Sequence, residues 1–222
     1  MPARAHLESL LKARKLDVTL THLAPWRALE RQQQDLAETG VPAVDAALGG
    51  GLRRGHLSEV IGGRSSGRTS VMCHALAAAT SRDELVALVD TNDRFDPLTA
   101  AAAGLDLSRL LWIRETGDAT RALKAMNLVL QAGGFGLVVL DLADVADRVV
   151  RTLPFTTWFR LARIIEGSQT VALLIASEHL GRSSGGATIA LEPTGASAAL
   201  WAAPDSHRGR LLTGVALHPR VV

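Results

Sequence analysis

The sequence predicts an α/β protein whose core is an open, doubly wound, mostly parallel β-sheet. From Gly40 onward, apolar strand-like segments alternate with helix-forming segments, and short glycine-marked loops separate them. Runs such as residues 137–140 and 171–176 are apolar along their whole length, which is typical of strands covered by helices on both faces. In sheets of this kind, ligands bind at the carboxyl ends of the strands.

The expected core elements alternate along the chain. The predicted strands are 57–61, 85–90, 110–114, 136–141 and 170–177, and the predicted helices are 67–80, 97–103, 118–132 and 154–166. Strand-like segments near 188–191, 198–202 and 210–217 follow, and we expect them to extend the sheet in antiparallel fashion. Leucines at near-helical spacing in residues 3–16 predict a helical extension over 1–38, with the core and its C-terminal β extension over 39–222.

Composition excludes several classes of protein. A formal charge of +2 gives no basis for binding a polyanion through net charge. Cys73 is the only cysteine, which excludes an intrachain disulfide and a cysteine zinc cluster, and we expect it to be buried. No apolar stretch reaches membrane-spanning length and the N-terminus lacks a signal-peptide pattern, so we expect a cytoplasmic protein without membrane contact.

One segment resembles a phosphate-binding loop with one altered position. It comprises Gly62, Gly63, Arg64, Ser65, Ser66, Gly67, Arg68, Thr69 and Ser70. The pattern of Gly, four residues, Gly, Lys and Ser or Thr surrounds phosphates with backbone N–H groups at a helix N-terminus. Arg68 replaces the lysine. Guanidinium binds phosphate, but it is longer and planar, so we expect nucleotide binding to survive better than phosphoryl transfer. A Gly/Ser-rich turn without a ligand is the alternative for the segment alone.

Two further residues predict a metal contact. Asp141 ends the predicted strand 136–141, where phosphate-loop proteins place an acid near Mg²⁺, and the hydroxyl of Thr69 would bind the same ion. ATP and Mg²⁺ are therefore the expected ligands. A surface aspartate that ends a strand is the alternative for Asp141 alone.

Residues 39–192 resemble the ATPase core of the bacterial RecA recombinases. The resemblance is carried by the segment from Thr39 to Gly55, by the loop 62–69 with its Ser-Ser-Gly, and by the segment 90–97, Asp-Thr-Asn-Asp-Arg-Phe-Asp-Pro. It implies that the catalytic glutamate of RecA falls at Asn92, whose amide cannot act as a general base. It also places the Asn-Gln γ-phosphate sensor of RecA at Ser177-Glu178. Little or no ATP hydrolysis is therefore expected, unless Asp93 or Glu178 supplies the missing carboxylate.

Among RecA-like proteins, the chain is similar to the ImuA-type proteins of bacterial damage-induced mutagenesis. The similarity lies in the short N-terminal helix, the segment 42–48 and the segment 209–215. It implies a DNA repair accessory of the SOS response and of error-prone translesion synthesis. The implied partners are an inactive Y-family polymerase paralogue, a replicative-type polymerase and RecA. The alternatives are an active DNA-dependent RecA-fold ATPase and a regulator of RecA filaments in recombination.

Arginines are the candidate DNA contacts. Arg182 lies in a glycine-flanked loop at the predicted ligand edge, and Arg148 and Arg151 precede an aromatic stretch. Basic residues beside aromatic ones can follow a nucleic-acid backbone. However, Phe155, Phe159 and Ile164 share one face of the predicted helix 154–166, which favours core packing with the arginines on the solvated side.

Overall fold

A seven-stranded sheet forms the centre of the unit Leu36–Val222, which is one of two compact units in the chain. The computed structural model describes residues 35–181, 185–191, 199–202, 211–215 and 217–222. The predicted helix 3–16 lies outside these residues, as does nearly all of the predicted extension 1–38. The strand order is β11 (Pro219–Val221), β8 (Thr188–Leu191), β3 (Leu57–Gly62), β7 (Val171–Ala176), β6 (Leu137–Asp141), β4 (Val86–Asp90) and β5 (Leu110–Arg114).

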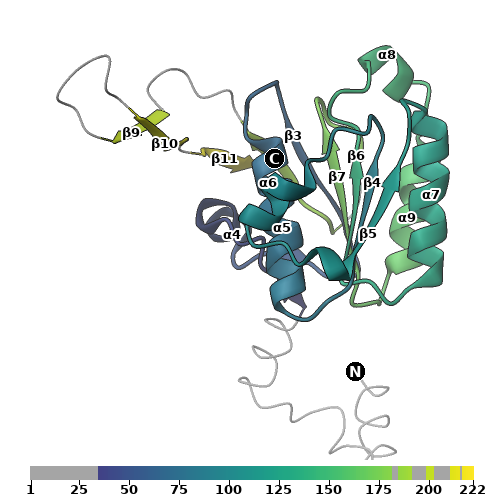
Figure 1. Ribbon diagram of the computed structural model, residues 1–222. Helices are drawn as coiled ribbons and strands as arrows, with labels where there is room; N and C mark the ends of the chain where they lie inside the picture. Colours follow the sequence, from purple (N-terminus) through teal and green to yellow (C-terminus); the bar gives the residue numbers. More distant parts are fainter. Residues whose placement is uncertain (1–34, 182–184, 192–198, 203–210, 216) are drawn as a thin grey trace, which may run out of the picture. The chain divides into compact units, whose positions relative to one another are not determined.

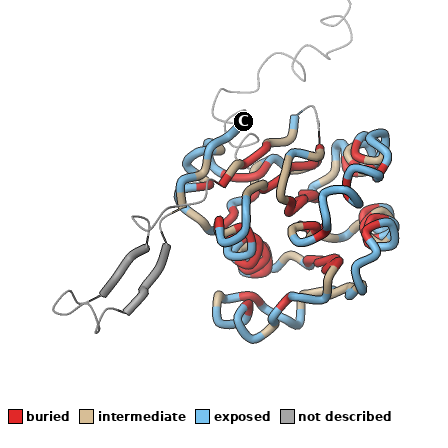
Figure 2. Tube along the Cα trace, turned by 90° about the horizontal axis from the view of Figure 1, so that it is seen from above, coloured by how far each residue is buried: buried red, intermediate tan, exposed pale blue. Residues whose placement is uncertain are grey.

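All neighbouring strands from β8 to β5 are parallel, and β11 is an antiparallel edge strand. The predicted doubly wound, mostly parallel α/β sheet is confirmed. Helices α5 (Arg68–Ser81) and α6 (Pro97–Ala102) cover one face, and α7 (Ala119–Ala132) and α9 (Thr156–Ile165) cover the other (Figure 1). Each face buries its own apolar core against the strands, as the buried positions in Figure 2 show. Cys73 is buried as expected.

Short elements complete the described chain. They are β1 (Leu36–Ala37), α4 (Pro42–Leu48), β2 (Leu52–Arg53), the 3₁₀ turn η1 (Leu107–Arg109) and α8 (Asp147–Val150). Among the described residues, no helix is long and apolar enough to span a membrane.

Aspartate caps determine where two helices begin. The carboxylate of Asp96 accepts hydrogen bonds from the N–H groups of Leu98 and Thr99, and Pro97 occupies the first helical position of α6. The carboxylate of Asp118 accepts hydrogen bonds from the first turn of α7 at 2.9 and 3.0 Å. These caps satisfy N–H groups that have no partner inside the helix. The segments after β4 and β5 therefore turn into helix at fixed positions.

The C-terminal strands differ from the prediction. β8 runs parallel to β3, with Glu59 opposite Thr188 and Gly62 opposite Leu191, so the expected antiparallel direction at 188–191 is wrong. β9 (Ala199–Ala202) and β10 (Leu211–Val215) pair antiparallel with each other in a separate two-stranded sheet. The segment between β7 and β8 is nearly as long as a usual parallel crossover although it contains no predicted helix. The amino-acid composition of this segment does not reveal that β8 runs parallel to β3, because the direction of a strand depends on the strand with which it pairs.

The face of α9 also differs from the prediction. Trp158, Leu161 and Ile165 are buried, whereas Phe155 and Phe159 are 49% and 46% exposed. The expectation that both phenylalanines pack inward is therefore wrong. The large indole and two aliphatic side chains, at i, i+3 and i+7, determine which side of α9 faces the core. Phe155 and Phe159 contact each other edge to face on the outside, with ring centroids 5.0 Å apart.

A buried carboxylate links β3 to the segment that follows β7. Glu59 is 2% exposed and accepts hydrogen bonds from the N–H groups of Leu180 and Gly181 at 3.0 and 2.9 Å. It also accepts one from the hydroxyl of Thr188 at 2.6 Å and contacts Nδ1 of His179. Because buried polar groups need partners, this cluster holds residues 179–181 and the start of β8 against β3.

Candidate nucleotide-binding site

The segment between β3 and α5 forms a tight loop at the carboxyl end of the sheet. Gly67 has φ of +94°, and a Cβ atom there would lie 2.4 Å from Cδ2 of Leu217. A Cβ atom at Gly62 would lie 2.6 Å from the carbonyl oxygen of Leu191. No side chain of a described residue caps the N-terminus of α5, which is 14 residues long, so its first N–H groups are available to an anion. The glycines of the pattern are thus required by the geometry of this loop.

Two hollows flank the loop. The larger, about 720 Å³, is lined by Gly40, Val41, Pro42, residues 65–70, His74 and Leu217. The smaller, about 280 Å³, is lined by Arg64, Ser65, Arg68, Thr69, Met72, Asp90, Asn92, Arg94, Phe95, Asp141, Ala143 and Asp144. Ser65, Arg68 and Thr69 line both hollows. The larger volume is in the range of ligand pockets, and the smaller one holds most of the charged groups.

The guanidinium of Arg68 is buried in the smaller hollow with few partners. Arg68 is 6% exposed, and its one hydrogen bond to a described residue runs from Nη1 to the carbonyl oxygen of Ala143 at 3.4 Å. No carboxylate of the described residues lies within ion-pair distance of it. Burial lowers the pKa of Arg68, and the more distant charges of Asp141 and Asp144 oppose that shift. A buried cation with this little compensation is expected to bind an anion.

Asp141 lies at the end of β6, directly opposite Asp90 at the end of β4. One carboxylate oxygen accepts a hydrogen bond from the N–H group of Ala143 at 2.9 Å. Burial raises the pKa of Asp141 to about 6, against this hydrogen bond and the charge of Arg68, and the nearby Asp90 and Asp144 add to the increase. A further cation beside Asp141 would stabilise its ionised form.

The groups present fit a Mg²⁺ ion. Thr69 and Asp141 line the same hollow, and their side chains carry the oxygen ligands that Mg²⁺ prefers. When bound, the ion would neutralise phosphate charge between these two residues. Whether either residue contacts a metal stays a prediction.

The two carboxylates that could replace a catalytic glutamate are both held by arginines. Both oxygens of Asp93 accept hydrogen bonds from Arg114, at 2.6 and 2.7 Å, and this pairing holds the pKa of Asp93 below its usual range. Both oxygens of Glu178 accept hydrogen bonds from Arg151, at 2.9 and 3.0 Å. Neither Asp93 nor Glu178 lines the two hollows, whereas Asn92 lines the smaller one. Of these three residues, only Asn92, whose side chain is an amide, lines a hollow.

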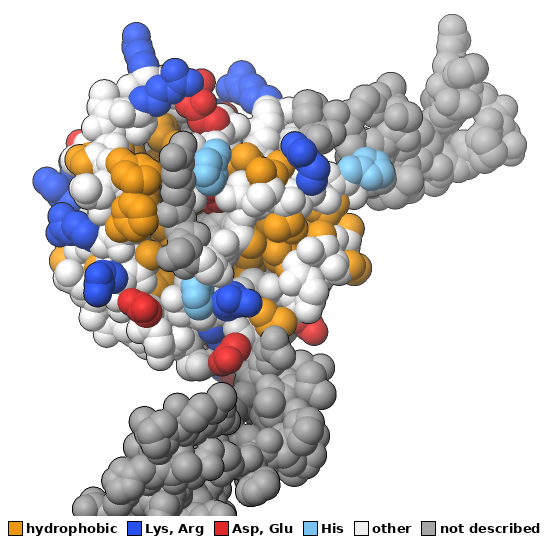
Figure 3. Space-filling model, turned by 180° about the vertical axis from the view of Figure 1, so that it is seen from behind, with side chains coloured by type: hydrophobic (Ala, Val, Ile, Leu, Met, Phe, Trp, Pro, Cys, Tyr) orange, Lys and Arg blue, Asp and Glu red, His pale blue; other side chains and the backbone are white. Residues whose placement is uncertain are grey.

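The candidate DNA contacts are placed as follows. Arg148 is exposed in α8, Arg151 is paired with Glu178, and Arg182 lies outside the described residues. On the face opposite to that of Figure 1, hydrophobic side chains gather between Lys and Arg side chains (Figure 3). A role of these arginines in DNA binding stays a prediction.

Several residues of the site were missed by the sequence analysis. Leu217 contacts the loop from the segment before β11, and His74 lines the larger hollow from the second turn of α5. Arg94 and Asp144 form an ion pair at 2.7 Å between the segments after β4 and after β6. Arg94 follows Asn92 by two residues and Asp144 follows Asp141 by three, and this proximity in sequence was the only indication that they belong to the site. Nothing in the sequence around Leu217 indicated that it lies beside the loop.

Asp141 gives a test of the site through stability. The pKa of Asp141 is higher in the folded protein than in the unfolded chain, so ionisation of Asp141 favours unfolding. Its effect on the free energy of unfolding is absent below the ordinary pKa of aspartate, and stability is lost as pH rises from there through about 6. We expect Asp141→Asn, measured without divalent cations, to increase the free energy of unfolding at pH 8 by about 1–2 kcal/mol. The shift itself corresponds to at most about 3 kcal/mol, which partial exposure of the carboxyl reduces. The two proteins should have equal stability near pH 4 by urea unfolding. A decrease at pH 8 would contradict this account.

Comparison with known proteins gives the following. A family model for the RecA N-terminal domain matches residues 25–152. Protein RecA of Chlorobaculum tepidum is 38% identical over 104 residues, which are 46% of this chain and 30% of that protein. Protein RecA of Symbiobacterium thermophilum is 35% identical over 114 residues, which are 51% of this chain and 32% of that protein. The chain thus matches about a third of the length of these relatives. The crystal structure of the RadB recombinase aligns with TM-score 0.53 and 19% identity, covering 71% of this chain and 83% of that one, which shows a shared fold.

Proposed function

The chain belongs to the RecA N-terminal domain family, and we propose that it is an accessory protein which binds nucleotide without turning it over. The observation that carries this proposal is Arg68, a buried guanidinium at the lysine position of the phosphate loop with one hydrogen bond to a described residue. Its environment supports binding of an anion. ATP, with Mg²⁺ between Thr69 and Asp141, is the proposed ligand.

Three features support the lack of turnover. Asn92 stands where the resemblance to RecA implies the catalytic glutamate, and an amide cannot accept a proton as a general base. Asp93 and Glu178 each form two hydrogen bonds with one arginine, and neither residue lines the two hollows. Removing a positioned base costs about 10²- to 10⁴-fold in rate.

The cellular role that we propose is support of error-prone translesion synthesis in the response to DNA damage. The resemblance to ImuA-type proteins supports this role. The proposed partners are an inactive Y-family polymerase paralogue, a replicative-type polymerase and RecA. The second candidate is an active DNA-dependent RecA-fold ATPase, or a regulator of RecA filaments, which family membership supports.

Separate Asp93→Asn and Glu178→Gln variants distinguish the two candidates. If the site is catalytically silent, neither substitution changes phosphate release in the presence of ATP and single-stranded DNA. If either carboxylate acts as the base, its variant loses most of the turnover. The accessory role is tested by co-expressing the chain with the Y-family paralogue and with RecA. Failure to co-purify with either protein would contradict that role.

The exposed phenylalanines of α9 are the proposed contact for the polymerase paralogue. Paired aromatic side chains near half exposure are unusual on a free surface and are enriched among residues that dominate interface energy. We expect Phe155→Ser/Phe159→Ser to weaken capture of the paralogue at least tenfold, about 1.4 kcal/mol or more. The melting temperature should change little, because neither ring is in the core. Leu98→Ser, on a side chain that is 81% exposed on α6, is the matched control. Equal capture by both variants would exclude the α9 face.

A further inference from the structure

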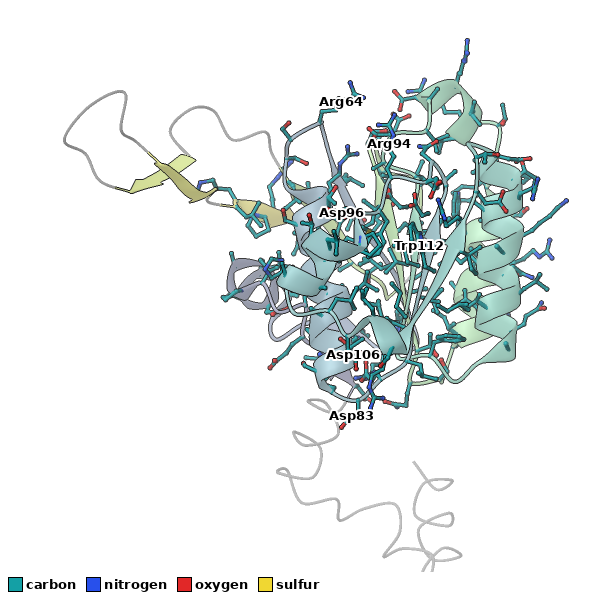
Figure 4. The ribbon with its side chains drawn as sticks, viewed as in Figure 1. Arg64, Asp83, Arg94, Asp96, Asp106 and Trp112 are labelled. Carbon is teal, nitrogen blue, oxygen red and sulfur yellow. The ribbon has the colours of Figure 1, made fainter. Side chains whose placement is uncertain are left out.

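Three arginines from two segments converge on the smaller hollow beside the phosphate loop. Arg64 and Arg68 belong to the loop itself, and Arg94 follows β4. In Figure 4, Arg64 and Arg94 both lie at the end of the sheet at which the parallel strands finish, whereas Asp83 and Asp106 lie at the opposite end. The sequence pattern accounts for Arg68 as the replaced lysine. It does not account for the other two arginines.

A single carboxylate holds the two outer arginines. Nη1 of Arg94 lies 2.7 Å from one oxygen of Asp144, and Nε of Arg64 lies 3.7 Å from the other. The side chains of Arg64 and Arg94 are 82% and 60% exposed, and that of Asp144 is 29% exposed. Exposed ion pairs of this kind contribute on the order of 0–1 kcal/mol, so exchange of Asp144 for another anion costs little. Asp144 therefore holds both guanidinium groups at the hollow by weak ion pairs, which another anion can replace.

The inner arginine indicates that the hollow takes an anion. Arg68 is more than nine-tenths buried, and among the residues that the structure describes its one hydrogen bond is long. A guanidinium has five N–H donors, so most of its donors are left for a ligand in the hollow. Three guanidinium groups line this hollow where the usual phosphate loop has one lysine, and the carboxylates of Asp90, Asp141 and Asp144 line it with them.

We propose that Arg64 and Arg94 recognise the third phosphate of a nucleoside triphosphate, and that Asp144 occupies its place when no triphosphate is bound. This inference rests on the proposed nucleotide site and names the class of nucleotide that it selects. The α- and β-phosphates contact the loop N–H groups, which di- and triphosphates share. The terminal phosphate replaces Asp144 as the partner of Arg64 and Arg94, because arginine forms charge-assisted, bidentate hydrogen bonds with phosphate.

The exchange has a consequence for the segment after β6. Asp144 lies between Asp141 and α8, and the hydroxyl of Ser177 at the end of β7 donates to Asp147 at 2.8 Å. When a triphosphate takes both arginines, Asp144 loses these two ion pairs, and the hydrogen bond between Ser177 and Asp147 does not depend on them.

Equilibrium binding of ATPγS and of ADP to the full chain tests the proposal. We expect ATPγS to bind at least about 30-fold more tightly than ADP, and Arg64→Ala/Arg94→Ala to reduce this ratio to about three or less, because each charged hydrogen bond is worth about tenfold or more. Affinity for ADP should fall much less than affinity for ATPγS, because ADP lacks the phosphate that Arg64 and Arg94 contact. Asp144→Asn should bind ATPγS about threefold to tenfold more tightly, since the competing anion is removed. Arg109→Ala, which removes an arginine paired with Asp83 outside both hollows, is the control.

The possible results distinguish a wrong role for Arg64 and Arg94 from a wrong assignment of the nucleotide site. If ADP and ATPγS both bind but the double variant keeps the wild-type ratio, the role of Arg64 and Arg94 is wrong and the nucleotide site stands. If neither nucleotide binds to the wild-type chain, the proposed nucleotide site is wrong and this inference falls with it. Melting temperatures of all variants show whether they are folded; both outer arginines are exposed, so no decrease is expected.

Discussion

Glu59→Ala is expected to lower the free energy of unfolding by about 3–5 kcal/mol, a large part of the 5–15 kcal/mol that stabilises a typical domain. Glu59 is the buried acceptor for the N–H groups of Leu180 and Gly181 and for the hydroxyl of Thr188. Alanine leaves these donors without a partner in the protein interior. Each orphaned donor costs about 1–3 kcal/mol. Urea unfolding followed by circular dichroism measures the loss.

Two further variants test the cause of this effect. Glu59→Gln keeps one acceptor oxygen and should recover about half of the loss. Glu166→Ala removes a carboxylate of the same type from an exposed position at the end of α9 and should change stability little. A loss of less than about 1 kcal/mol for Glu59→Ala would mean that the buried cluster does not hold the segment after β7.

Gly67→Val is expected to reduce nucleotide affinity about 100-fold or more and to destabilise the fold by about 1–3 kcal/mol. Gly67 has φ of +94°, which a β-branched residue avoids, and its Cβ atom would collide with the side chain of Leu217. Restoring an allowed conformation turns the loop N–H groups away from the anion position. Isothermal titration calorimetry with ATPγS measures the loss of affinity.

Gly133→Val is the matched control for that variant. Gly133 also has a positive φ, +69°, but no atom of the described residues lies within 4 Å of the Cβ position, and Gly133 ends α7 on the opposite face of the sheet. It should show a comparable backbone cost in stability and unchanged affinity for ATPγS. If Gly133→Val loses affinity as Gly67→Val does, the effect is global destabilisation and the conformation of the loop is not its cause.

The core of the fold could be predicted because its signals are local. The apolar runs 137–140 and 171–176 are long enough to identify buried parallel strands, and β6 and β7 occupy them. The loop between β3 and α5 was also recognisable, since its glycines have a fixed spacing. The predicted roles of Arg68, Thr69 and Asp141 stay predictions, although the structure brings all three to one hollow.

What could not be predicted depends on contacts between distant segments. The direction of β8 is set by its pairing with β3, and the exposure of Phe155 and Phe159 is set by how Trp158 fits the core. Glu59 is a charged residue in the middle of a strand, and its buried state is possible because donors arrive from residues more than 100 positions away. The pairing of Arg94 with Asp144 joins two loops that share no sequence pattern. Local periodicity contains none of this information.

ATP binding and phosphate release, measured side by side on the full chain with and without single-stranded DNA, test the central claim most directly. We expect saturable binding of ATP and phosphate release no faster than that of an Arg68→Ala variant, which lacks the binding cation. This result follows from the buried guanidinium at the loop, from the amide of Asn92 where the resemblance implies the catalytic glutamate, and from the pairing of Asp93 and Glu178 with arginines. DNA-stimulated release that is abolished by Arg68→Ala would contradict the account, and so would failure of the wild-type chain to bind ATP.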